Sequence, residues 1–275
     1  MKKYNIHPSA KIGKNVIIEC SEFNLGPNSI IKDNCKITCT SFTAGKGLYM
    51  CEGVEVGRGG CYGPNSKVVI GDNVGIFERA IINPSDQIII GDNTGIGAEV
   101  MIWTHGSWLD VTQGFPADFG PVTIEENVWL PARCIVLANV NIGKNTVIGI
   151  GSIVNRSIPE GSLAAGSPCK VIKENYYPKK LSLEEKEKLV LGILEDWKKL
   201  VEYKVGSLYK YFVSYNKENT SIELKQALNN IPCSTFYNIT EKTIKGTQND
   251  LSEDLRDYLR RRGIKIFTNN NFKSI

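Results

Sequence analysis

The sequence predicts a mainly-β protein: a parallel β-solenoid of stacked coils, followed by a small C-terminal α/β domain. Three observations predict the solenoid. An aliphatic residue recurs every six positions, turn-forming residues follow many of these aliphatics, and glycine occupies 26 of 275 positions. The remaining composition is ordinary, with 41% hydrophobic residues and a formal net charge of +4. It excludes the disordered, collagen-like and coiled-coil classes.

The six-residue period is unbroken in the middle of the chain. Six residues correspond to about 600° on a helical wheel, so aliphatics at this spacing would spiral around every face of a helix. The same register recurs upstream in short runs that begin at Ile6, Leu25, Ile70 and Ile90. Short strands joined by turns therefore fit the pattern. The unbroken positions are Ile124, Leu130, Val136, Ile142, Ile148 and Val154.

Turn formers follow these aliphatics directly, as in Gly71–Asn73, Gly91–Asn93 and Gly143–Asn145. Gly and Asn tolerate the left-handed backbone angles that a tight corner requires. A strand of about four residues cannot bury an apolar face alone. Coils stacked about 4.8 Å apart solve this, because each inward side chain then has a neighbour above and below it.

The period is lost over residues 103–122, between Ile102 and Ile124, and more briefly over residues 83–86. Long excursions from a tight scaffold commonly carry function. The longer excursion contains His105, one of only two histidines in the chain. The other, His7, lies in the first repeat, and no function is assigned to it.

The solenoid pattern ends near Tyr176–Pro178. The predicted domains are therefore residues 1–178, with the protruding loop 103–122, and residues 179–275, whose role stays open. A capping box at Ser182–Glu185 begins a helix that reaches about Tyr203. The run Arg260–Gly263 is typical of a helix end with a glycine cap, and the alternative is a phosphate site. The domain should also hold a helix over 251–262 and strands over 208–215, 235–239 and 264–267.

Eight cysteines without a C-x-x-C pair predict reduced, semi-buried thiols and no zinc knuckle. The mild positive charge does not indicate nucleic acid. No apolar run is long enough for a membrane helix, and the first residues lack the apolar stretch of a signal peptide. We expect a cytoplasmic protein without membrane insertion.

Three stretches resemble one branch of the hexapeptide-repeat acyltransferases, the galactoside, maltose and xenobiotic acetyltransferases. They are Ile124–Ala132, Ile148–Val154 and Ala164–Ile172, and the resemblance covers about residues 70–173. It implies a left-handed parallel β-helix, acetyl-CoA as the acyl donor without a metal, and a homotrimer with a coenzyme A groove between neighbouring solenoids. It also implies a saccharide or nucleotide-sugar acceptor.

The resemblance further implies that His105 is the general base that deprotonates the acceptor. A neutral imidazole accepts protons near neutral pH, and such help contributes roughly 10²–10⁴ in rate. Coenzyme A would meet backbone groups at Ala132, Ile150 and Gly151 beside Trp129, for which simple packing is an equal alternative. Asn155 matches a hydroxyl residue of relatives. Lys170 and Lys173 stand where relatives carry arginines facing the nucleotide phosphates, and solvated surface lysines are the alternative.

Acceptor binding is assigned to polar and aromatic side chains of the two excursions and one nearby corner. Sugar hydroxyls favour carboxylates and amides with an aromatic face nearby, although rim carboxylates also serve solubility. The predicted acceptor residues are Glu78, Asn83, Ser85, Asp86, Trp108, Asp110 and Asp118.

The predicted activity is transfer of an acetyl group from acetyl-CoA to a saccharide hydroxyl. The alternative within the class is acylation of the amine of an amino sugar, including a nucleotide-linked one. A zinc hydratase on the same solenoid needs three histidine ligands, and the chain has two histidines. A non-catalytic solenoid, the remaining alternative, predicts regular surface threonine rows and no long loop.

Overall fold

The computed structural model describes residues 2–206, 209–228, 231–268 and 272–274. The chain divides into two compact units, Met1–Lys179 and Lys180–Ile275. In the part of the chain that is described, neither helix is long and apolar enough to cross a membrane.

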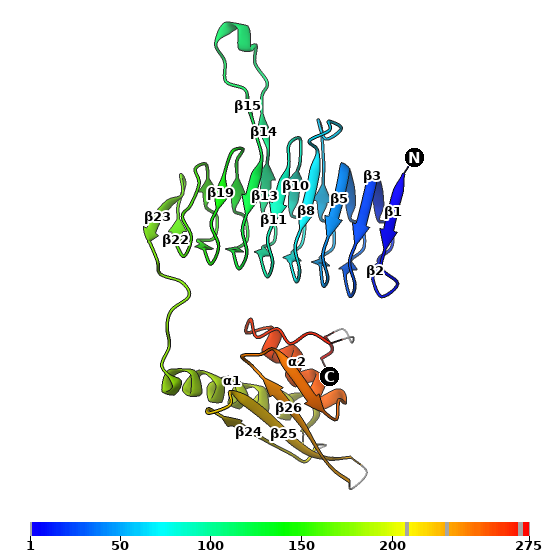
Figure 1. Ribbon diagram of the computed structural model, residues 1–275, viewed down its shortest axis with the longest axis vertical. Helices are drawn as coiled ribbons and strands as arrows, with labels where there is room; N and C mark the ends of the chain where they lie inside the picture. The colour runs from blue at the N-terminus through cyan, green and yellow to red at the C-terminus, as the bar shows by residue number, and fades with distance from the viewer. Residues whose placement is uncertain (1, 207–208, 229–230, 269–271, 275) are drawn as a thin grey trace. The chain divides into compact units, whose positions relative to one another are not determined.

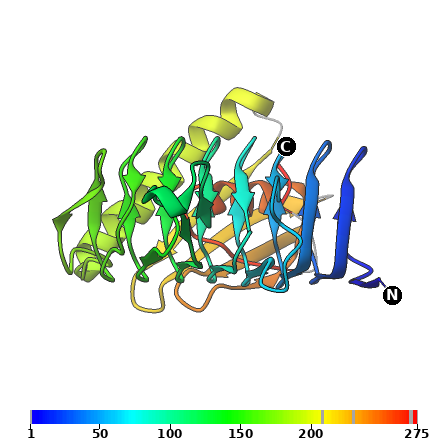
Figure 2. The ribbon, with the colours of Figure 1, turned by 90° about the horizontal axis from the view of Figure 1, so that it is seen from above.

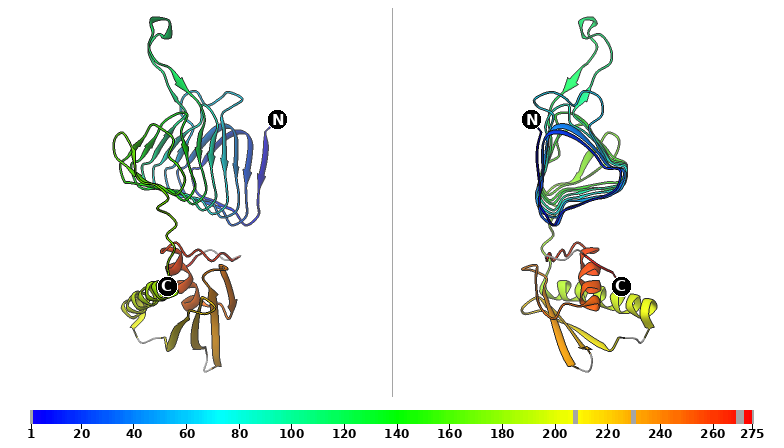
Figure 3. Two further views of the ribbon diagram at one scale, coloured as in Figure 1. Left: turned by 60° about the vertical axis from the view of Figure 1, so that its left-hand side comes forward. Right: turned by 90° about the vertical axis from the view of Figure 1, so that its right-hand side faces the viewer.

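The first unit is a left-handed parallel β-helix with triangular coils, visible end-on in Figure 3. One face of the triangle is a 9-stranded sheet. Its strands are β2 (Lys11–Ile12), β4 (Ile30–Ile31), β6 (Tyr49–Met50), β9 (Gly75–Ile76), β12 (Gly95–Ile96), β17 (Trp129–Leu130), β20 (Val147–Ile148), β22 (Leu163–Ala165) and β23 (Lys170–Lys173).

The other two faces belong to one 12-stranded sheet that bends around a corner. The long strands β3 (Ile17–Leu25) and β5 (Lys36–Ala44) contribute to both faces, since β5 pairs with β7 at its start and with β8 at its end. Beyond them the second face holds β7 (Glu55–Val56), β10 (Ile81–Asn83), β13 (Met101–Trp103), β18 (Ile135–Val136) and β21 (Ile153–Val154). The third holds β1 (Lys3–Ile6), β8 (Lys67–Ile70), β11 (Ile88–Ile90), β16 (Val122–Ile124) and β19 (Asn141–Ile142).

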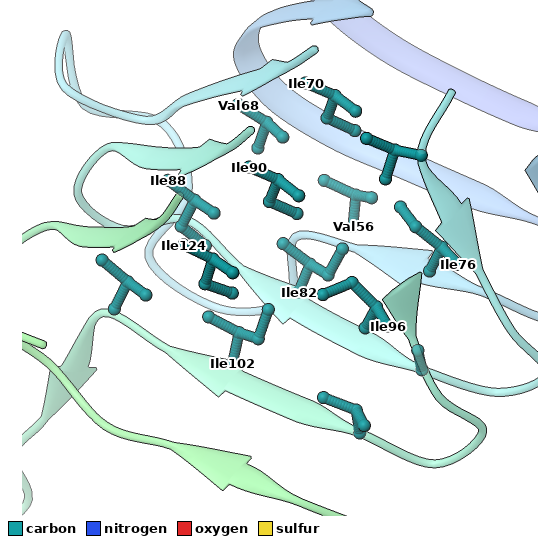
Figure 4. Packing of buried hydrophobic residues seen from close by; sticks show 14 of the residues in the cluster. Val56, Val68, Ile70, Ile76, Ile82, Ile88, Ile90, Ile96, Ile102 and Ile124 are labelled. Carbon is teal, nitrogen blue, oxygen red and sulfur yellow. The ribbon is translucent and has the colours of Figure 1, made fainter. Parts of the chain in front are cut away.

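The six-residue aliphatics form the core of this column. Each pairs in register with the equivalent residue of the next coil, as Ile82 does with Ile102 and Ile102 with Val136. Figure 4 shows these side chains stacked inside the triangle. All six positions of the unbroken run, Ile124, Leu130, Val136, Ile142, Ile148 and Val154, are fully buried. The predicted solenoid and its register are confirmed.

One corner is built by asparagines that stand above one another in successive coils, and Figure 2 shows the coils side by side. Asn73, Asn93, Asn127 and Asn145 all adopt positive φ between 56° and 60°. Asn is one of the few residues other than glycine that enters this conformation readily. The turn formers seen in the sequence thus close the coil.

The first coil departs from the predicted burial. Ile6 and Ile12 keep the register, yet both are exposed. Each inward side chain needs a coil on both sides, and within this chain these two have a neighbour only on one side, since β1 pairs with β3 and β2 with β4.

The second unit places two helices against an antiparallel sheet of order β24-β25-β26-β27. Its elements are α1 (Leu183–Val205), β24 (Tyr211–Asn216), β25 (Ser221–Leu228), β26 (Ile231–Asn238), β27 (Thr243–Gly246) and α2 (Asp250–Arg260). The capping box is present, with Ser182 accepting from the backbone N–H of Glu185. Trp197 of α1 donates to the Asp254 carboxylate of α2 at 2.9 Å.

One prediction for this unit needs correction, and two strands were missed. Residues 264–267 are not a strand, because the segment packs against α2 and the Arg256 guanidinium donates to the Ile266 carbonyl. β25 and β27 were not predicted, and the predicted start of a strand at residue 208 lies outside the described residues. The helix-end interpretation of Arg260–Gly263 is confirmed, since α2 ends at Arg260 and Gly263 adopts a positive φ of 78°.

Two adjacent isoleucines of β11 provide a test of the core. Ile90 is 1% exposed and Ile89 is 37% exposed. We expect Ile90→Ala to lower the free energy of unfolding by about 2–5 kcal/mol, because it leaves a cavity between two coils. Ile89→Ala, the matched control, should change it by less than about 1 kcal/mol. Denaturant unfolding followed by circular dichroism measures both, and equal losses would contradict the inward register.

Candidate active site

His105 lies where the long excursion leaves the solenoid. It follows β13 and forms β14 (His105–Gly106), which pairs antiparallel with β15 (Asp118–Phe119). The two strands form the stem of the arm that projects from the column in Figure 1. A short 3-10 helix, Val111–Gln113, lies near the tip of this arm. The imidazole is thus held at the base of the arm, beside the coils.

Three side chains surround the imidazole. The Ser85 hydroxyl is 2.9 Å from Nδ1 of His105. The ring of Phe119 stacks on the imidazole with a centroid distance of 5.9 Å, and Trp103 meets it edge-on at 6.1 Å. These contacts fix the ring plane of a half-buried histidine. The aromatic neighbours were not predicted, although they stand at the two ends of the excursion.

The shorter excursion, residues 83–86, is tied to the start of the long one. The Thr104 hydroxyl donates to the Asn83 carbonyl at 2.8 Å and accepts from the Asp86 backbone N–H at 2.9 Å. Both excursions leave the same corner of the triangle in successive coils, since β10 pairs with β13. The two excursions therefore lie side by side.

A third excursion, residues 57–66, leaves this corner one coil earlier, between β7 and β8. Its Cys61 is fully buried, and the thiol donates to the amide oxygen of Asn83 at 2.8 Å. A Cβ on Gly60 would lie 3.0 Å from the Ser85 hydroxyl. The sequence analysis missed this segment. Its signal is the cluster of glycines at Gly57, Gly59, Gly60 and Gly63.

The predicted acceptor residues are only partly brought together. Ser85 lies beside His105, the Asp86 backbone N–H donates to the preceding residue Thr104, and Asp118 pairs with the following residue Gly106. Asn83 is 1% exposed, and its amide oxygen is committed to Cys61. Within one chain Asn83 therefore packs inside the corner, and its predicted contact with the acceptor stays a prediction.

Three other predicted acceptor residues lie away from the imidazole. Glu78 follows β9, at a different corner of the coil from the one that carries the excursions. The Asp110 carboxylate caps the 3-10 helix by accepting from the Thr112 backbone N–H and hydroxyl, which lowers the pKa of Asp110. Trp108 is 94% exposed on the arm. Among the described residues, neither Glu78 nor Asp110 has a side-chain contact with His105 within one chain, and their assignment to the acceptor stays a prediction.

Trp129 lies on the outer surface of the 9-stranded sheet. Its indole covers Gly95, where a Cβ would come within 2.5 Å of the ring. Phe77 meets it edge-on with a centroid distance of 6.4 Å. The absence of a side chain at Gly95 therefore lets the exposed indole lie flat on the sheet. Phe77 is a neighbour that the sequence analysis did not identify.

The residues whose backbone groups are predicted to contact coenzyme A share one corner of the coil. They are Ala132, Ile150 and Gly151. The Gly151 N–H donates to the Ala132 carbonyl at 3.1 Å, and Ile150 is exposed. Two arginines of the same corner, Arg79 and Arg133, are held by the Glu99 carboxylate at 2.6 and 2.8 Å. The Arg79 contact, followed by Arg133, lowers the pKa of Glu99.

The predicted phosphate contacts lie at the end of the solenoid. Asn155, Lys170 and Lys173 are all exposed. The Lys173 ammonium sits 4.5 Å from the centroid of the Tyr176 ring, and Lys179 sits 4.3 Å from the same centroid. The Lys179 contact, followed by the charges of both lysines, lowers the pKa of Tyr176. Positive charge is therefore gathered beside one aromatic ring.

Comparison with known proteins supports the resemblance seen in the sequence. No family model matches the chain. A Saccharomyces cerevisiae protein provisionally named an acetyltransferase is 44% identical over 112 residues, 40% of this chain and 57% of the relative. The galactoside O-acetyltransferase of Escherichia coli is 44% identical over 70 residues, 23% of this chain and 34% of the relative. These relatives confirm the resemblance to the galactoside acetyltransferase branch over the matched part.

The matches are partial. The chain spans 57% of the length of the yeast relative and 34% of the bacterial one. Among solved structures, a galactoside acetyltransferase in complex with coenzyme A is 28% identical to this chain. The match covers 51% of this chain and 72% of that one, with a TM-score of 0.34.

No group of three or more His, Cys, Asp or Glu side chains in the described ranges is arranged to hold a metal ion. A zinc hydratase would need a cluster of this kind.

The fit of Trp129 over Gly95 generates a prediction. Gly95→Ala should displace the indole from the sheet, because the new Cβ would overlap the ring. The fluorescence of Trp129 is obtained by subtracting the spectrum of a matched Trp129→Phe variant. We expect acrylamide to quench this fluorescence more strongly in Gly95→Ala. Gly192→Ala is the control, since a Cβ there meets nothing within 4 Å. Unchanged quenching in Gly95→Ala would contradict the placement of the ring.

Proposed function

We propose that the protein is an acyltransferase that moves an acetyl group from acetyl-CoA to a hydroxyl of a saccharide, with His105 as general base. The observation that carries the proposal is the half-buried imidazole, fixed by Ser85 and Phe119 at the base of the arm. Support comes from relatives that are named acetyltransferases and, in two cases, galactoside O-acetyltransferases.

In the proposed reaction, Nε2 of His105 removes the proton from the acceptor hydroxyl. The oxygen attacks the thioester carbonyl and forms a tetrahedral intermediate. This intermediate collapses with cleavage of the carbon–sulfur bond, and the imidazolium returns its proton to the departing thiolate. The products are the acetyl ester and free coenzyme A, so atoms and charge balance without a metal or a redox step.

The donor is proposed to lie along the corner of Ala132, Ile150 and Gly151, with Trp129 as an apolar wall. The nucleotide phosphates would meet Lys170 and Lys173 beside Asn155. A groove of this kind is open on one chain, and a neighbouring solenoid would close it. We therefore propose a homotrimer, which solution mass measurement tests directly: a strictly monomeric active species would contradict it.

The acceptor is proposed to lie between the two excursions, where Asp86 and Asp118 offer carboxylates near His105. Trp108 would reach an acceptor from the arm of the same or a neighbouring chain. The identity of the sugar is left to the assay, which compares simple sugars, amino sugars and nucleotide-linked sugars. The cytoplasmic location predicted from the sequence stays a prediction.

The general base is tested by His105→Ala. We expect kcat to fall by roughly 10²–10⁴ while the KM for acetyl-CoA changes little, because the imidazole acts on the acceptor proton. Thiol release from acetyl-CoA with each class of sugar measures both. His7→Ala is the control for general effects of removing an imidazole. A tolerant His105→Ala enzyme would instead favour acylation of an amine, which needs less help from a base.

The phosphate contacts are tested by a Lys170→Ala/Lys173→Ala variant. We expect the KM for acetyl-CoA to rise by about tenfold or more with kcat largely retained, since the lysines are assigned to ground-state binding only. With an acetylated dephospho-coenzyme A the variant and the parent should differ less. Lys14→Ala, a lysine of the first coil, is the matched surface control. An unchanged KM would assign the two lysines to solubility alone.

A further inference from the structure

The contact between Ser85 and His105 is the outer end of a series of polar groups that leads into the solenoid. Ser85 is half-buried, whereas Asn83 and Cys61 are 1% and 0% exposed. Ser85 meets the imidazole at 2.9 Å, and Cys61 donates to Asn83 at 2.8 Å. The hydroxyl of Ser85 also interacts with the Cys61 thiol. Four side chains from three successive coils are therefore linked.

The direction of donation along this series follows from the chemistry of its members. Burial raises the pKa of the Cys61 thiol, so it stays protonated and can donate only its one S–H. Two oxygens accept from this S–H, the Asn83 amide oxygen at 2.8 Å and the Gly59 carbonyl at 3.7 Å, and the much shorter contact assigns it to Asn83. The Ser85 hydroxyl acts against burial and lowers the pKa of the Cys61 thiol, as a donor to the sulfur does, so we assign the Ser85 O–H to the sulfur lone pairs. With its own proton used in this way, the Ser85 oxygen is left to accept from Nδ1–H of His105.

The tautomer of the imidazole matters for the proposed reaction. A neutral imidazole carries one proton, and the nitrogen without it is the one that can act as a base. If Nδ1 holds the proton and gives it to Ser85, Nε2 has a free lone pair. In the opposite tautomer Nε2 already carries the proton, so it cannot remove a proton from the acceptor hydroxyl.

We propose that Ser85, which lies between the Cys61 thiol and the imidazole, is the positioning residue that keeps His105 in its Nδ1–H tautomer, with Nε2 free to deprotonate the acceptor. This inference rests on the proposed function. It reassigns Ser85 and Asn83 from substrate contacts to the orientation of the base.

Among the described residues, neither of the nearby carboxylates, Asp86 and Asp118, has a side-chain contact with the imidazole, so the neutral Ser85 is the residue assigned to this role. The Asp86 carboxylate accepts from the Gln87 backbone N–H at 2.7 Å. Asp118 lies opposite Gly106 in the hairpin, and the residue opposite His105 is Phe119. Among the described residues, the side-chain contacts recorded for His105 are the Ser85 hydroxyl and two aromatic rings.

Selective labelling of histidine with nitrogen-15 tests the proposal on the full chain. With two histidines in the sequence, the spectrum is simple, and His105→Ala assigns the signals. At about pH 8, where an ordinary imidazole is neutral, the two ring nitrogens report which one is protonated. We expect Nδ1–H for His105 in the parent protein and a shift toward Nε2–H in Ser85→Ala.

Kinetics of the same variants give the second readout. Ser85→Ala should lower kcat by about 10- to 100-fold with KM for both substrates changed by less than about threefold, because only the base is affected. Ser85→Thr keeps the hydroxyl and should restore both the tautomer and most of kcat. Cys61→Ala should weaken the Nδ1–H preference by a smaller amount, whereas Cys61→Ser keeps a donor and acceptor there and should preserve it.

The outcomes separate this inference from the proposed function. If His105→Ala retains full activity, the proposed function fails, whatever the spectrum shows. If His105→Ala is inactive but Ser85→Ala keeps the Nδ1–H tautomer, the positioning role is wrong. A Ser85→Ala enzyme with raised acceptor KM, unchanged kcat and an unchanged tautomer would return Ser85 to substrate binding. Circular dichroism and unfolding of Cys61→Ser against Cys61→Ala show whether a loss comes from the fold instead.

Discussion

The rest of the structure depends on in-register stacking of inward aliphatic side chains. Backbone hydrogen bonds join each coil of this solenoid to the coils above and below it. An extra residue within a strand would break these hydrogen bonds and turn the following side chains of that strand outward. Extra residues can be accommodated at corners, where the ladder is already interrupted. Three excursions, residues 57–66, 83–86 and 103–122, use one corner in successive coils. Stacking therefore brings residues from separate insertions together beside His105, as the contact of Ser85 with the imidazole shows.

This constraint explains why the solenoid could be predicted from the sequence and the second unit only in part. In a solenoid the period along the chain is the period in space, so Ile124 and its successors reveal the core directly. In the antiparallel sheet, pairing depends on residues far apart in sequence, and β25 and β27 were missed. The segment 264–267 has strand-like composition, yet a side-chain donor from α2 satisfies the Ile266 carbonyl in place of a neighbouring strand.

The candidate site, too, could be predicted from the sequence only in part. His105 was predicted because the period breaks next to it, which is a local signal. Ser85 was predicted at the site only as an acceptor contact, and the aromatic partners Trp103 and Phe119 were not predicted, because contacts such as Ser85 to His105 depend on the number of residues in each coil. Glu78 and Asp86 are close in sequence, but the corner that follows β9 separates Glu78 from the imidazole. Phe119 comes 14 positions after His105 along the chain and stacks on it, because the hairpin pairs the two residues.

The side chains linked to His105 on the solenoid side, from Ser85 to Cys61 and Asn83, are neutral because this corner of the coil is largely buried. A carboxylate at the position of Cys61 or Asn83 would be removed from water without a recorded cation beside it, and burial of an unpaired charge is strongly unfavourable. A thiol, an amide and a hydroxyl can be buried at much lower cost when their hydrogen bonds are made. Such a series can orient an imidazole without bringing a second charge into the core. The requirements of the packed coil and of the base are then met by the same residues.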